Sequence, residues 1–137
     1  MKIKIDYPPN IRDILHVFPY ARTPGVIFTY GDTLYNPSNR PISDALKAHE
    51  ETHAAQQERV GVETWWNLYL ESPQFRFDQE LKAHGVEWRH ILNNGANRNE
   101  RRSQLTIIAK RLSGPLYGRM VTLDLARKMI DTEARHG

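Results

Sequence analysis

Start and stop signals for helices divide the last two-thirds of the chain and leave little room there for strands. A helix is predicted over about 43–60, with Ser43 as its N-cap and Gly61 as its stop. A second long helix is predicted over about 73–92, because it opens with a Ser-Pro pair that suits a cap and a first helical turn. Hydrophobic spacing and turn residues predict further helices over 63–70, over 98–112 and from Thr122 onward, so that residues 98–137 form basic C-terminal helices.

Strand patterns are expected in about residues 1–35. Residues 26–30 and 33–35 predict a hairpin joined by Gly31-Asp32, and glycine at the first turn position suits a type II′ turn. Residues 1–7 alternate apolar and charged side chains, which predicts an edge strand, and a short helix is expected over 10–18. The fold class is therefore α+β, mainly helical with a small N-terminal antiparallel sheet.

Length and composition limit what such a fold contains. At 137 residues the chain is too short for two well-formed cores, so a single domain over 1–137 is expected. The chain has no cysteine, which excludes disulfides, cysteine-based zinc fingers, iron–sulfur clusters and thiol catalysis. Its sequence shows neither an export signal nor an apolar run of membrane-spanning length, which predicts a soluble, cytoplasmic protein without membrane contact.

The predicted helix over 43–60 contains the pattern His-Glu-x-x-His. His49 and His53 are one turn apart on the same helix face and can present two imidazole nitrogens to one metal ion. Glu50 follows the first histidine, which places its carboxylate beside that metal, where it can accept a proton from water. The motif predicts a catalytic zinc site.

Catalytic zinc takes three protein ligands, and Glu80 is the candidate for the third. Glu80 and His84 lie beside the apolar stripe of the helix over 73–92 and face partly inward. Burying either group without a partner is costly, and a metal ion would supply the partner. Glu71 and Glu87 are weaker candidates, because Glu71 adjoins a helix start and Glu87 lies about 10 Å further along the helix.

A resemblance to a known family rests on the same residues. Residues 26–92, with the run His49-Glu50-Glu51-Thr52-His53-Ala54-Ala55-Gln56-Gln57 and Glu80 on a later helix, resemble the zincin metallopeptidases of the gluzincin type. The compact chain is similar to their minimal single-domain members, which include phage-encoded zinc peptidases. The resemblance implies a zincin-like core, zinc on His49, His53 and Glu80, and peptide hydrolysis with Glu50 as general base and acid. It also implies a peptide or protein substrate along the edge strand, at 26–30 or 33–35.

One position departs from that family. Many gluzincins carry an aspartate four residues after the ligand glutamate, where it orients a ligand histidine, and this chain has His84 there. A neutral His84 is then a partner that orients a ligand, or it is itself a fourth ligand. Four protein ligands would make a closed, structural zinc site in place of a catalytic one.

Two side chains are weaker candidates for the site. Tyr117 lies on a Gly/Pro-rich connection, from which its hydroxyl could donate to the oxyanion of a tetrahedral intermediate; an ordinary packed or exposed tyrosine is the alternative. Gln56 lies on the face of His49 and could hydrogen-bond within the site, or lie on the surface.

Two further functions stay open. Glu50-x-x-His53 and Glu87-x-x-His90 are the paired motif of ferritin-like di-iron bundles. Such a site also needs a lone glutamate from each of two other helices, and the predicted helix over 10–18 offers only Asp13. Residues 98–137 carry 9 Lys/Arg and 4 Asp/Glu, a net charge of +5. A binding module with a structural zinc site could therefore contact an acidic partner or a nucleic acid weakly through residues 98–111, with the basic side chains Arg98, Arg101, Arg102, Lys110 and Arg111.

Overall fold

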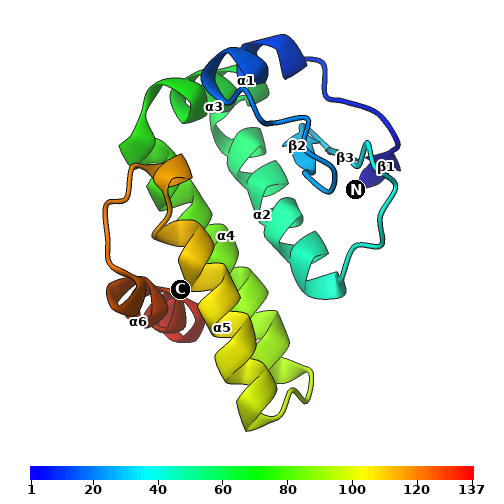
Figure 1. Ribbon diagram of the computed structural model, residues 1–137. Helices are drawn as coiled ribbons and strands as arrows, with labels where there is room; N and C mark the ends of the chain where they lie inside the picture. Colours follow the sequence, from blue (N-terminus) through cyan, green and yellow to red (C-terminus); the bar gives the residue numbers. More distant parts are fainter.

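The computed structural model describes residues 1–137, with the side chain of Leu116 excepted. It is an α+β structure, mainly helical with a small sheet (Figure 1). The strands are β1 (Lys2–Lys4), β2 (Phe28–Tyr30) and β3 (Thr33–Tyr35). The helices are α1 (Ile11–Val17), α2 (Asp44–Val60), α3 (Val62–Glu71), α4 (Pro73–Asn93), α5 (Arg98–Leu112), the 3₁₀ turn η1 (Pro115–Tyr117) and α6 (Leu123–His136).

The helix boundaries follow the capping residues. The hydroxyl of Ser43 accepts from Leu46 N–H at the start of α2, and the hydroxyl of Ser72 accepts from Phe75 N–H at the start of α4, both at 3.1 Å. Gly61 ends α2 with a φ of 93°, a conformation that favours glycine. The predicted bounds of α2, α4 and α5 are confirmed, because these helices begin and end on local signals.

The sheet is mixed, so the prediction of an antiparallel sheet is wrong for one of its strands. β2 and β3 form the predicted antiparallel hairpin, but β1 pairs with β3 in parallel, in the order β1-β3-β2. The chain passes through α1 between β1 and the hairpin, so no tight turn forces an antiparallel pairing. The prediction that 33–35 offers a free edge is also wrong, because β3 lies between the other two strands.

Two hydrophobic clusters flank the contact between α2 and α4. The N-terminal cluster joins α1, the hairpin and α3 and includes Ile14, Phe28 and Trp65. The C-terminal cluster joins α4, α5, η1 and α6 and includes Trp88 and Ile130. In Figure 1 the sheet lies beside α2, while α5 and α6 lie against α4. Side chains of α2 and α4 that face each other therefore lie between two packed regions, away from bulk water.

None of the described helices is long and apolar enough to cross a membrane.

Candidate metal centre

Helix α2 directs both histidines of the His-Glu-x-x-His pattern inward. His49 and His53 are each only 5% exposed, and their Nε2 atoms are 3.2 Å apart. The four-residue spacing on one helix face brings the two rings together, as expected from helix geometry. Two imidazole nitrogens thus point at one location.

Helix α4 brings the carboxylate of Glu80 to the same location. Its Oε1 atom lies 3.0 Å from His49 Nε2 and 2.7 Å from His53 Nε2. In a tetrahedral zinc site, ligand atoms 2.0–2.1 Å from the metal are about 3.3 Å apart. The three predicted side chains therefore come together as a buried group that could hold a metal ion, with donor atoms slightly closer than around zinc.

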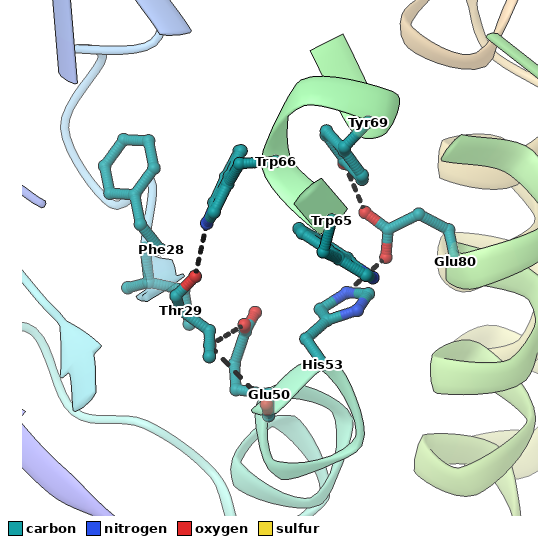
Figure 2. Close-up of a pocket in the computed structure, with 9 residues that line it drawn as sticks. Phe28, Thr29, Glu50, His53, Trp65, Trp66, Tyr69 and Glu80 are labelled. Carbon is teal, nitrogen blue, oxygen red and sulfur yellow. Dashed lines mark hydrogen bonds and ion pairs between the residues drawn. The ribbon is translucent and has the colours of Figure 1, made fainter. Parts of the chain in front are cut away.

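Two tyrosines hold the other oxygen of Glu80. Tyr69 of α3 donates its hydroxyl to Glu80 Oε2 at 2.6 Å (Figure 2), and Tyr117 of η1 donates to the same oxygen at 3.1 Å. Both bonds leave Oε1 directed at the histidines. The hydroxyl of Tyr117 therefore lies beside the site, where it bonds to the candidate ligand Glu80. Donation from Tyr117 to an oxyanion stays a prediction. Sequence reasoning did not identify Tyr69, because nothing in the predicted helix over 63–70 links it to the His-Glu-x-x-His pattern.

Glu50 is buried beside this group without belonging to it. Its Oε2 accepts a hydrogen bond of 2.6 Å from the hydroxyl of Thr29 in β2 (Figure 2). Glu50 shares a small cavity of about 60 Å³ with His53 and Glu80. Its carboxylate is therefore positioned by the sheet, and it lines this cavity.

The outer nitrogens of both histidines are bonded to carboxylate or amide oxygens. His49 Nδ1 donates to Glu87 Oε1 at 2.9 Å, and His53 Nδ1 donates to Gln56 Oε1 at 2.9 Å. A proton held on Nδ1 leaves Nε2 as the nitrogen that can bind a metal. The hydrogen bond predicted for Gln56 is confirmed. Glu87 lies further along α4 than Glu80 and does not take its place beside His49 Nε2. It bonds instead to Nδ1, the opposite nitrogen of the His49 ring.

His84 contacts the outside of this arrangement. Its Nδ1 lies 3.2 Å from Glu87 Oε1, and its ring centroid is 4.6 Å from that of His49. His84 groups with His49 and Glu87 as a second set that could hold a metal, not with His53 and Glu80. Its position corresponds to the predicted orienting role more closely than to a fourth ligand, although it acts on His49 through Glu87.

Opposite charges compensate for the burial of these groups. Burial alone lowers the pKa of His49, but the carboxylates of Glu80 and Glu87 outweigh it and raise the pKa to about 10. Burial would raise the pKa of Glu87, yet its bonds to His49 and His84 lower it to about 2. The pKa of Glu80 is held well below its ordinary value by His53 and His49, against its burial. Without metal, His49 is therefore protonated, and its positive charge lies between the carboxylates of Glu80 and Glu87.

This charge pattern predicts how the stability of the metal-free protein depends on pH. The raised pKa of His49 stabilises the fold fully below about pH 6.5, and this stabilisation is lost as the pH rises through about 10. We expect the free energy of unfolding to fall between these pH values, and to fall less in His49→Gln. Denaturant titrations at several pH values, with the exposed His16→Gln as control, measure it. If the free energy of unfolding fell equally with pH in wild type and in His49→Gln, the raised pKa of His49 would be contradicted.

The geometry disfavours a di-iron site. His90 of the second Glu-x-x-His pair hydrogen-bonds to Asn94 near the end of α4 and lies outside the buried group. Glu50 and Glu87 belong to no common metal-binding set among the described side chains.

The basic side chains of α5 are exposed, as a contact with an acidic partner would require, but they lie on a different helix from the site.

Comparisons of the chain with protein-family models, with curated proteins and with solved structures found no match.

Proposed function

We propose that the protein is a zinc-dependent hydrolase of peptide bonds. The observation that carries the proposal is the arrangement of four buried side chains, three of which converge while the fourth lies beside them. His49, His53 and Glu80 direct three donor atoms at one location, whereas Glu50 is bonded to Thr29 and lines the adjoining cavity. Two imidazoles and one carboxylate form a known donor set of catalytic zinc, which leaves one position open.

Zinc bound by these three residues would act as a Lewis acid and would lower the pKa of water to near neutrality. Glu50 then takes a proton from the attacking water as its oxygen bonds to the peptide carbonyl carbon. The same carboxyl passes the proton to the amide nitrogen, and the C–N bond breaks to release a carboxylic acid and an amine. Thr29 keeps Glu50 oriented for both transfers.

The proposal is tested by zinc-loaded protein and a mixture of unstructured peptides. We expect hydrolysis that a chelator removes and that added zinc restores, with products identified by mass spectrometry. Zinc binding without any hydrolysis would instead support a structural zinc site in a binding module, with the exposed basic face of α5 as the contact surface.

The contribution of the third ligand is tested by comparing Glu80→Ala with His84→Ala. Glu80 supplies a donor atom, so its loss should weaken zinc binding by at least about tenfold, and by more than the loss of His84, which acts through Glu87. Chelator competition measures both affinities. If His84→Ala cost more than Glu80→Ala, His84 would be a ligand and the site would be closed.

A further inference from the structure

The two carboxylate oxygens of Glu80 make different contacts. Oε1 lies 3.0 Å from His49 Nε2 and 2.7 Å from His53 Nε2, within the group that could hold a metal ion. Oε2 accepts a hydrogen bond of 2.6 Å from the hydroxyl of Tyr69 (Figure 2) and one of 3.1 Å from the hydroxyl of Tyr117. Each carboxylate oxygen has about two lone-pair positions, so these two bonds occupy Oε2 and leave Oε1 for a metal.

The two hydroxyls come from different hydrophobic clusters. Tyr69 belongs to the N-terminal cluster, where its ring is stacked on that of Trp65 with the centroids 4.8 Å apart. Tyr117 belongs to the C-terminal cluster and is 5% exposed. Packing therefore holds each hydroxyl in place separately, and the carboxylate of Glu80 bonds to both.

The hydrogen bond of Tyr117 gives this residue a role that differs from donation to an oxyanion. A tyrosine hydroxyl has a single proton to donate. While Tyr117 donates that proton to Glu80, it cannot donate it to a reacting group. The two roles are distinguishable, because only a bond to Glu80 affects how the metal is bound.

The use of one oxygen by Glu80 limits the number of donor atoms around a metal. Carboxylates bind metals through one oxygen or through both. With Oε1 alone, His49, His53 and Glu80 supply three donors, the number found in catalytic zinc sites that keep a fourth position open. If Oε2 were also free to bind, the same three residues would supply four donors, and a further carboxylate oxygen suits metals of higher coordination number such as manganese.

We propose that Tyr69 and Tyr117 are positioning residues that hold Glu80 as a monodentate ligand. They thereby favour a four-coordinate metal such as zinc over metals of higher coordination number. The proposal rests on the metal site of the function proposed above, and it is tested without any substrate.

Cobalt(II) bound in place of zinc reports the coordination number directly, because its visible absorption is intense in four-coordinate sites and weaker at higher coordination. We expect an intense spectrum for the wild type and a loss of intensity in the double variant Tyr69→Phe/Tyr117→Phe, which keeps both rings and frees Oε2. Each single variant carries the same test, with the larger loss expected for Tyr69→Phe because its hydrogen bond is shorter. Tyr35→Phe is the matched control, since Tyr35 is also buried but its hydroxyl bonds to none of the residues that the structure describes.

The affinities for zinc and manganese are the second readout, measured by chelator competition. Loss of a hydrogen bond to a metal ligand weakens metal binding by about 10–100-fold, so zinc affinity should fall by about that factor in the double variant. Manganese affinity should fall less, because the freed Oε2 supplies a further donor atom. The ratio of zinc affinity to manganese affinity therefore decreases, whereas Tyr35→Phe leaves it unchanged.

Three results would contradict the proposal. An unchanged cobalt spectrum in a folded, cobalt-loaded double variant would overturn the positioning role and leave the hydrolase standing. If Tyr117→Phe lowered kcat but left the cobalt spectrum unchanged, Tyr117 would donate to the oxyanion and would not position Glu80. Protein that bound neither cobalt nor zinc would overturn both the positioning role and the proposed function.

Discussion

Replacing either His49 or His53 by alanine is expected to abolish stoichiometric zinc binding. Each substitution removes one of three donor atoms and leaves Glu80 Oε1 without one of its two buried partners, at 3.0 Å and 2.7 Å. Zinc held by two ligands in place of three does not survive chelator competition, because metal affinity depends on the complete donor set. Zinc content after dialysis, measured by atomic emission, is the readout.

The exposed His136→Ala is the control for these variants, since it removes an imidazole without touching the buried group. Circular dichroism shows whether the variants fold. Equal zinc content in wild type, His49→Ala and His53→Ala would reject the site.

The substitution Glu50→Gln is expected to keep zinc and to lose hydrolysis. The amide is the same size and can still bond to the Thr29 hydroxyl, but it cannot accept a proton from water. General acid–base catalysis contributes about 10²–10⁴-fold, so kcat should fall by roughly that factor. Zinc affinity should stay within a few fold, because Glu50 is outside the donor set.

The neighbouring Glu51→Gln is the matched control, because Glu51 is exposed on the same helix. It should change neither zinc content nor kcat. Loss of zinc in Glu50→Gln would make Glu50 a ligand and would favour a di-iron type of site over the hydrolase.

Features of the fold that depend on local signals could be predicted from the sequence. Ser43 and Ser72 cap α2 and α4 because a side-chain oxygen near a helix start accepts a backbone N–H whatever the rest of the fold does. The convergence of His49 and His53 follows in the same way from the helical repeat. The direction of β1 could not be predicted, since alternating residues pair equally well in parallel and antiparallel sheets.

The surroundings of the site depend on how elements pack against each other. Glu80 could be selected from its helix face, but the bond from His49 to Glu87 requires the register between α2 and α4, which no local pattern contains. Tyr69 lies in the predicted helix over 63–70, and its hydroxyl reaches Glu80 only because α3 turns back onto α4. Gln57 stood within the motif run, and its hydrogen bonds to the β2–β3 hairpin follow from the sheet lying against α2.

The position of zinc in the loaded protein tests the central claim most directly. Crystals grown with zinc and measured at the zinc absorption edge locate the metal by anomalous diffraction. We predict one zinc ion at about 2.0–2.2 Å from His49 Nε2, His53 Nε2 and Glu80 Oε1, with the Glu50 carboxylate outside its ligands. Zinc bound at His84 and Glu87 in its place, or no zinc between α2 and α4, would contradict the account.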